Sequence, residues 1–157
     1  MKINSARGNN LHLGLFRYLF ILGVGRGAAG ASDFTDADAQ QDYTLLTPAA
    51  GDAVTYPLAQ AYTKIGFAGG ALSAVTLDVG FSNGSEFLLN GAMFALNACA
   101  VSPLVSGAGG PKFFDGATAL TARIDTTGAN LSEITKGEIW IYVNLITINE
   151  ALKLIDA

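Results

Sequence analysis

Few side chains in this chain of 157 residues have the chemistry of a catalyst. His12 is the single histidine and Cys99 the single cysteine. A Ser-His-Asp triad needs a histidine beside its nucleophile, and zinc sites draw mainly on histidine and cysteine, so the sequence favours neither. Cys99 lies between two alanines, without a cationic neighbour to activate the thiol, and as a lone cysteine it cannot form an intrachain disulfide. We therefore expect Cys99 to be a small buried side chain.

Two carboxylates, Asp78 and Asp125, are the remaining candidates for acid–base chemistry. Each lies in a run whose alternate residues are apolar, so both side chains could point outward from neighbouring strands. Paired carboxylates of this kind catalyse glycoside hydrolysis. The outer face of a sheet also requires polar residues at these positions, and we expect both aspartates to serve that purpose. With no phosphate-binding loop, calcium-loop spacing or cysteine pair, the sequence predicts no enzyme, no cofactor and no metal site.

Gly25, Gly27 and Gly30 match the G-x-G-x-x-G spacing of a dinucleotide-binding turn. That fingerprint requires an amphipathic helix directly afterwards and then a second buried strand. Residues 31–41 instead contain several aspartates, with Phe34 as their only large apolar residue. The alternative of a nicotinamide enzyme therefore lacks its structural context, and we interpret this Gly/Asp-rich segment as a flexible joint.

The most apolar part of the chain is the run from Leu11 to Val24, which follows Lys2 and Arg7. A basic start and an apolar run are typical of a signal peptide, but Arg17 interrupts this run, so we expect it to be retained. About 14 apolar residues are too few for the roughly 20 that cross a bilayer, so no membrane span is expected. We predict an N-terminal arm that docks on another subunit or adds to a sheet, because burial alone does not offset the entropy of ordering it.

The composition favours one globular β domain that is partly covered by other chains. Apolar residues make up 50% of the sequence and charged residues 14%, with a mean hydropathy of +0.37. Such an apolar chain is expected to self-associate or to bind a large partner. The formal net charge is −4 and the nine Lys and Arg residues are scattered, which disfavours nucleic-acid binding.

From Asp42 onward, short β-rich runs alternate with Gly, Pro, Asn and Ser at the spacing of an antiparallel β-sandwich. The alternation is clearest from Leu72 to Phe81, and the Asn83-Gly84 pair after it predicts a hairpin. Further strands are expected at residues 43–46, 53–56, 59–67, 86–89 and 119–125, whereas residues 90–101 fit a short helix or a bent strand. The predicted organisation is an apolar arm and joint (1–41), an all-β sandwich domain (42–149) and a C-terminal tail (150–157).

The last predicted strand, Glu138 to Ile148, is apolar on both faces. One face carries Ile139, Ile141, Val143 and Leu145, and the other carries Trp140, Tyr142, Ile146 and Ile148. A strand in a sheet with one solvated face would carry polar residues on that face. This strand is therefore expected to be central in a covered sheet or to take part in a subunit contact.

The domain also resembles a known family. The resemblance is carried by Thr55–Leu58, Leu72–Gly80, Glu86–Asn90, Ala119–Arg123 and Asn130–Val143, within which Thr135-Lys-Gly-Glu-Ile-Trp-Ile-Tyr-Val143 is the best match. In this order they are similar to small virion proteins of tailed bacteriophages, the capsid decoration or cement proteins. The resemblance, over residues 42–148, implies a jelly-roll-like sandwich, often a homotrimer. It further implies assembly in the host cytoplasm and binding to the major capsid protein at the capsid surface of the virion.

A second hypothesis belongs to a different class. A receptor- or glycan-binding module of a phage fibre or bacterial surface protein would use the same sandwich. Under the decoration hypothesis, the contact elements are expected to be the arm and the aromatic face of the last strand, because aromatic residues carry much interface energy. The predicted subunit contacts are Leu11, Leu13, Leu15, Phe16, Tyr18, Phe20, Trp140 and Tyr142.

Overall fold

The computed structural model describes residues 2–7, 15–26, 28–81, 87–94, 96, 98, 100–101 and 112–146. These residues contain ten β-strands and two short 3-10 turns, η1 (Ala28–Gly30) and η2 (Leu131–Glu133). The strands are β1 (Lys2–Arg7), β2 (Leu15–Gly23), β3 (Gln40–Leu46), β4 (Ala53–Ala68), β5 (Ala74–Phe81), β6 (Phe87–Phe94), β7 (Ala100–Val101), β8 (Lys112–Phe113), β9 (Leu120–Thr127) and β10 (Lys136–Ile146). The predicted all-β class is confirmed.

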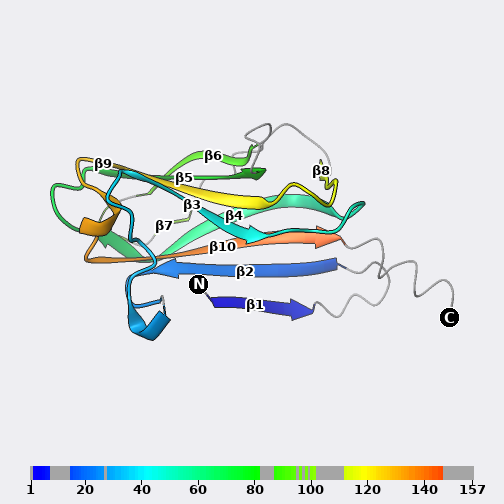
Figure 1. Cartoon of the computed structure of the whole chain (residues 1–157), viewed down its shortest axis with the longest axis horizontal. Helices are drawn as coiled ribbons and strands as arrows, with labels where there is room; N and C mark the ends of the chain where they lie inside the picture. The colour runs from blue at the N-terminus through cyan, green and yellow to red at the C-terminus, as the bar shows by residue number, and fades with distance from the viewer. Residues whose placement is uncertain are drawn as a thin grey trace, which may run out of the picture.

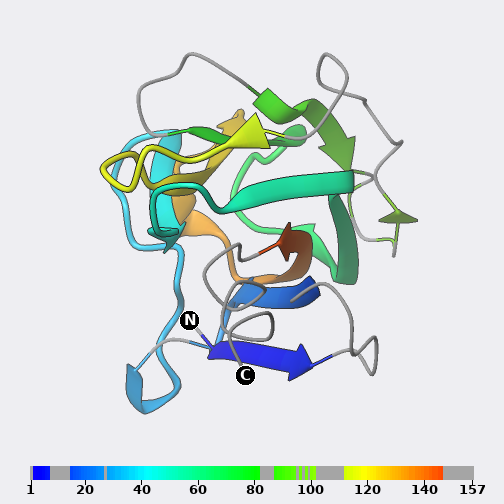
Figure 2. The ribbon, with the colours of Figure 1, turned by 90° about the vertical axis from the view of Figure 1, so that its right-hand side faces the viewer.

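The strands form two antiparallel sheets with jelly-roll order. The six-stranded sheet runs β1-β2-β10-β4-β7, with β8 also paired to β4, and the four-stranded sheet runs β3-β9-β5-β6. The pairs β2–β10, β3–β9, β4–β7 and β5–β6 are nested, the first strand with the last and so on inward, as in one long hairpin rolled into a sandwich. Figures 1 and 2 show β1 and β2 at one edge of the molecule and β5 and β6 at the opposite edge. The predicted antiparallel, jelly-roll-like sandwich is confirmed.

The core lies between the two sheets and is supplied by alternate residues of their central strands. Because successive side chains of a strand point to opposite faces, the period-two pattern of β5, β9 and β10 buries one set completely. These inward side chains are Val75, Leu77, Val79, Leu120, Ala122, Ile124, Ile139, Ile141, Val143 and Leu145. The face of the last strand that carries Ile139, Ile141, Val143 and Leu145 is thus the inward one, and β10 is a central strand between β2 and β4.

The N-terminal run is not an arm over residues 15–23. These residues form β2, which pairs with β10 along its whole length and with β1 on its other side. Phe20 and Leu22 face the core and are 0% exposed. The outer residue Ile21 is also buried, beside Trp140 in the register. The run is apolar on both faces because its inward residues enter the core and the outward Ile21 is buried as well. The sandwich therefore begins before residue 42, and its N-terminal part adds to the sheet of its own chain.

The segment predicted to be a flexible joint is tied to the sandwich. Phe34 is 1% exposed and packs against Phe67 with ring centroids 5.6 Å apart. The N–H of Gly23 donates to Asp33 Oδ2 at 3.0 Å, and the N–H of Leu131 donates to the carbonyl oxygen of Asp38 at 3.0 Å. The prediction of a flexible joint is therefore wrong, because one aromatic side chain and several backbone hydrogen bonds fix this crossover between the two sheets.

The two runs expected as separate strands at residues 53–56 and 59–67 form the single strand β4. Pro57 interrupts its pairing with β10, since proline has no N–H to donate, but the strand continues beyond it. The ambiguous segment 90–101 contains the end of β6 and the short strand β7, with a bend at Ala98 between them, which fits the bent-strand alternative. β5 and β6 pair antiparallel, as the Asn83-Gly84 signal predicts, although the turn itself lies outside the described residues, as does Cys99.

Candidate functional site

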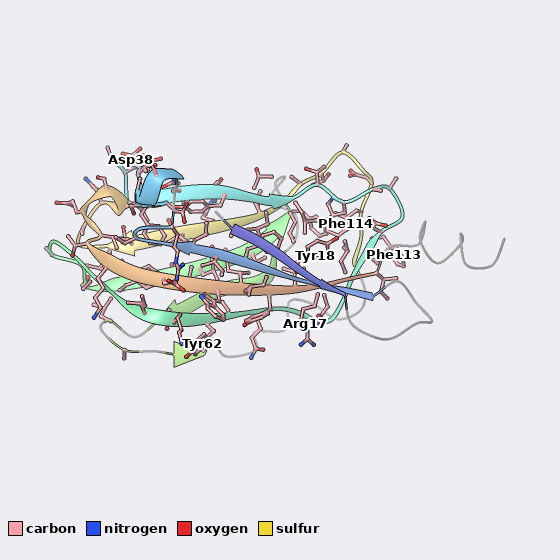
Figure 3. All side chains as sticks on the ribbon, turned by 90° about the horizontal axis from the view of Figure 1, so that it is seen from below. Arg17, Tyr18, Asp38, Tyr62, Phe113 and Phe114 are labelled. Carbon is pink, nitrogen blue, oxygen red and sulfur yellow. The ribbon has the colours of Figure 1, made fainter. Side chains whose placement is uncertain are left out.

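The outer face of the six-stranded sheet carries the most distinctive set of side chains on the molecule. We use the term outer face for the side of β2, β10 and β4 that points away from the four-stranded sheet. Its described residues are Arg17, Leu19, Ile21, Gln60, Tyr62, Lys64, Glu138, Trp140, Tyr142 and Asn144. Three of them are aromatic, and in Figure 3 Arg17 and Tyr62 lie on the lower side of the molecule, away from β3.

Trp140 is held at the centre of this face by three neighbours. The ring of Tyr62 meets it edge-on at 6.4 Å, and Lys64 Nζ lies 5.9 Å from the ring centroid, within the range of a cation–π contact. The indole Nε1 donates a hydrogen bond to Glu138 Oε1 at 2.6 Å. Trp140 is half-buried and fixed by its own chain, so it has little rotamer freedom left to lose in a contact with another molecule.

Glu138 is a buried carboxylate that connects the outer face to the loop after β2. Its side chain is 2% exposed, and Arg26 of that loop donates from Nε to Glu138 Oε2 at 2.7 Å. Gly25 and Gly30 have positive φ values of 76° and 80°, which glycine adopts without strain. In the described residues these glycines lead into the turn η1 and the crossover, so the loop has a structural role and no βαβ unit surrounds it.

Next to Tyr62 and Trp140 on the outer face lies a pocket of about 280 Å³, lined by Arg17, Gln60, Tyr142 and Asn144. Asn144 is 8% exposed and accepts a hydrogen bond from Arg17 Nε at 3.2 Å. The four side chains come from neighbouring positions of three strands, since Arg17 pairs with Asn144 and Gln60 with Tyr142. The lining residues that the structure describes thus combine one cation, two amides and a phenol on neighbouring strands.

A break in strand register lies beside the pocket. The pairs on either side of Asn144 are Val143–Ala59 and Leu145–Val54, so residues 55–58 of β4 lie opposite a single residue of β10. This bulge contains Pro57, which cannot donate to the ladder. The extra residues interrupt the β4–β10 ladder next to Asn144, and bulges of this kind are common beside binding sites.

The structure divides the predicted contact residues into three groups. Trp140 and Tyr142 lie on the outer face and are partly exposed, as predicted. Phe20 cannot be a surface contact because it is 0% exposed, and Tyr18 faces the core, where it stacks on Phe20 with centroids 6.2 Å apart. The backbones of Leu15 and Phe16 belong to β2, whereas Leu11 and Leu13 lie outside the described residues.

Sequence reasoning missed the polar half of the site. Arg17, Gln60 and Asn144 were not predicted as site residues, although two of them leave a signal in the sequence. Arg17 is the one charge in the apolar run from Leu11 to Val24, and Asn144 interrupts the apolar stretch from Ile139 to Ile148. A buried polar residue in an apolar strand requires a hydrogen-bond partner. For Asn144 one such partner is Arg17.

Asp78 and Asp125 do not form an isolated carboxylate pair. They lie on the outer face of the four-stranded sheet, where Asp78 is paired in register with Arg123 and Asp125 accepts a hydrogen bond from Gln40 at 2.7 Å. Arg123 makes two hydrogen bonds to Asp42, of 2.6 and 2.8 Å. This arrangement is a charged sheet surface rather than an acid–base pair.

The Asp42–Arg123 pair predicts a small, defined pH effect. The hydrogen bond from Arg123 holds the pKa of Asp42 below its usual value, near 3.9 in an unfolded chain. The pair therefore adds stability above pH of about 4, and this is lost as the pH falls through the folded pKa. We expect Asp42→Asn to cost at most about 1 kcal/mol at pH 6, because the pair is exposed, and less at pH 3. Urea unfolding at pH 6 and at pH 3 measures the stability difference between the wild-type protein and Asp42→Asn. An equal stability difference at the two pH values would contradict the prediction.

Asp52 is a buried carboxylate without an evident ligand. It is 5% exposed, its Oδ2 accepts from the N–H of Ala49 at 3.0 Å, and its Oδ1 has no hydrogen-bond partner. Burial, together with the charge of Asp52, raises the pKa of Tyr18. Among the described residues no group of three histidine, cysteine, aspartate or glutamate side chains could hold a metal ion, and Asp52 is therefore not part of such a cluster.

The fold and the outer face define the class of this protein: a jelly-roll β-sandwich with an aromatic sheet face. No protein-family model, curated protein or solved structure matches the chain. In the described part of the chain, no helix is long and apolar enough to span a membrane.

Proposed function

We propose that this chain is a virion structural protein, a capsid decoration protein that binds the major capsid protein and stabilises the shell. The observation that carries the proposal is the outer face of the six-stranded sheet, where Tyr62, Trp140 and Tyr142 are partly exposed on a rigid surface. Aromatic residues on such a surface are the usual anchors of protein interfaces. The sequence resemblance to decoration proteins of tailed bacteriophages supports the same function.

The physical properties of the outer face suit a structural role. The ring of Trp140 is held by Tyr62 and Glu138 before any partner binds, so few side chains must be ordered on docking. A decoration protein repeats the same contact at every site of a lattice, so a modest affinity per site is sufficient when copies are linked. We further propose that copies associate as a homotrimer at the capsid surface, with neither a nucleic acid nor a membrane as partner.

The number of copies per particle and the stability of the shell test this function. Purified particles should contain on the order of hundreds of copies, because a closed shell repeats its subunits by symmetry. Shells that lack the protein should lose integrity at a lower temperature than decorated shells, and adding the purified protein back should restore the difference. If bare and decorated shells were equally resistant to heat, the proposed function would be wrong.

A substitution on the outer face gives a sharper prediction. We expect Tyr62→Ala to weaken binding to bare shells by about 2 kcal/mol, roughly thirty-fold in dissociation constant, because the ring is a partly exposed aromatic anchor. The matched control is Phe113→Ala, which removes an aromatic ring that is 65% exposed on β8, opposite Ala53 and so at the other end of β4 from Tyr62. Sedimentation of labelled protein with shells measures both, and a larger loss from Phe113→Ala would place the contact elsewhere.

The pocket favours a second candidate function, a glycan- or receptor-binding module. Tyr142, two amides and Arg17 are groups that also hydrogen-bond and stack on sugar rings. A fibre module would be present in only a few copies per particle. The stoichiometry measurement therefore separates the two functions.

A further inference from the structure

The pocket on the outer face is rich in hydrogen-bond donors. Arg17 carries five N–H groups, and the amides of Gln60 and Asn144 and the hydroxyl of Tyr142 add further donors. Among its described lining residues there is one cation and no acid. Glu138, the carboxylate among the described residues of this face, is already paired with Arg26. A group that enters the pocket therefore meets a positive, donating surface.

Arg17 is oriented before anything binds. Its Nε donates to Oδ1 of Asn144, a residue that is 8% exposed and makes a further interaction in the structure. Because Nε is engaged by Asn144, the two terminal nitrogens of the guanidinium form the fork that points away from the sheet (Figure 3). A planar fork of this kind matches the two oxygens of a carboxylate. The hydrogen bond to Asn144 Oδ1 thus holds the guanidinium plane in place at the pocket.

We propose that this pocket receives the carboxylate side chain of an aspartate or glutamate on the protein to which the outer face docks. The proposal rests on the proposed function and specifies the chemistry of the partner's surface. A volume of about 280 Å³ accommodates one side chain, and it falls just below the usual range of drug-sized ligand pockets. Tyr62 and Trp140 supply the apolar contact beside it, and the carboxylate sets the register of docking.

The overall charge of the chain makes this local cation informative. With a formal net charge of −4, the protein repels an acidic partner at long range, so a favourable contact with a carboxylate must come from a specific cation. The other described cation of this face, Lys64, lies over the Trp140 ring. A doubly charged phosphate would be best held by more than one cation, whereas a single carboxylate matches one guanidinium.

A titration of the isolated protein tests the pocket without any shell. Glutarate is the probe and glutaramide its neutral control, with the side-chain N–H signals of Arg17 and Asn144 followed by NMR. We expect a saturable shift of both signals with glutarate, none with glutaramide, and none with glutarate in Arg17→Gln. Equal shifts with glutaramide or with glucose would overturn the proposal, the latter in favour of a sugar site.

A binding measurement on bare shells distinguishes failure of the pocket from failure of the proposed function. We expect Arg17→Gln to weaken binding at least about ten-fold, because it leaves the partner's carboxylate unpaired at the interface, and Arg17→Lys to retain part of the affinity. Lys136→Gln, which removes an exposed cation at the far end of β10, is the matched control and should bind normally.

If the wild-type protein does not bind shells, the proposed function fails. If it binds and Arg17→Gln binds equally well, the pocket proposal alone fails. Thermal unfolding confirms that each variant is folded.

Discussion

Deletion of residues 1–23 is expected to abolish cooperative folding. These residues include β2, which pairs with β10 along its whole length and places Phe20 and Leu22 in the core. Without β2, the inward residues of β10 lose their cover, and β10 becomes an edge strand with unpaired N–H and C=O groups. An exposed, long, apolar edge of this kind promotes aggregation. The truncated chain should therefore be recovered as aggregate or as a species without a thermal unfolding transition.

Point substitutions in β2 separate loss of packing from loss of the whole strand. Phe20→Ala should lower the free energy of unfolding by about 3–5 kcal/mol, the usual cost of removing a buried aromatic ring. Leu19→Ala, on the outer face of the same strand, is the matched control and should cost about 1 kcal/mol, because Leu19 is only partly buried. Urea unfolding measures both. A truncated chain with the melting temperature of the full chain would show instead that the segment is a dispensable arm.

The contrast between β2 and β5 shows what the sequence could reveal about this fold. In β5, apolar Val75, Leu77 and Val79 alternate with polar residues, because one face is buried and the other solvated, and this local pattern predicted the strand correctly. β2 has no such alternation, because Ile21 is buried on its outer side. Its partner β10 lies more than a hundred residues away in sequence, so no short-range signal identifies the pairing. The sandwich class was predictable, but the place of β2 within it was not.

The aromatic residues of the candidate site were predictable from the sequence, but its polar residues were not. Trp140 and Tyr142 follow from the alternation of β10, since its other face had to be the core. Gln60 could not be assigned, because its place beside Tyr142 depends on the register of β4, and that register shifts around Pro57. The polar pocket thus lies beside a bulge, whose position is known only once the strands are paired.

Substitutions in the Arg26–Glu138 pair are also expected to have a large effect on stability, and loss of the arginine should cost more than loss of the carboxylate. Arg26→Met should lower the free energy of unfolding by about 3–5 kcal/mol, because it leaves a buried carboxylate without its cation. Glu138→Gln should cost only about 1–2 kcal/mol, since it removes the buried charge itself. The side chain of Arg26 is 38% exposed and can return to water, whereas that of Glu138 is 2% exposed and cannot.

The double variant Arg26→Met, Glu138→Gln is the control for this explanation. If the buried charge causes the loss in Arg26→Met, then the second substitution should restore most of the lost stability. Urea unfolding at pH 7 measures the free energy of unfolding of all three variants. The comparison holds when the dependence of that free energy on urea concentration is the same in each variant. Equal losses from the two single substitutions, or no recovery in the double variant, would contradict a penalty from unpaired buried charge.

Glu138→Gln also connects stability to the outer face. The carboxylate accepts the indole N–H of Trp140, and the amide oxygen of glutamine can accept it too, but more weakly because it carries no charge. The indole should therefore become more mobile while the fold is kept. If Trp140 anchors docking, this variant should bind bare shells more weakly than its stability loss predicts, and its tryptophan fluorescence anisotropy should fall. An unchanged affinity with a more mobile ring would mean that the orientation of Trp140 does not contribute to docking.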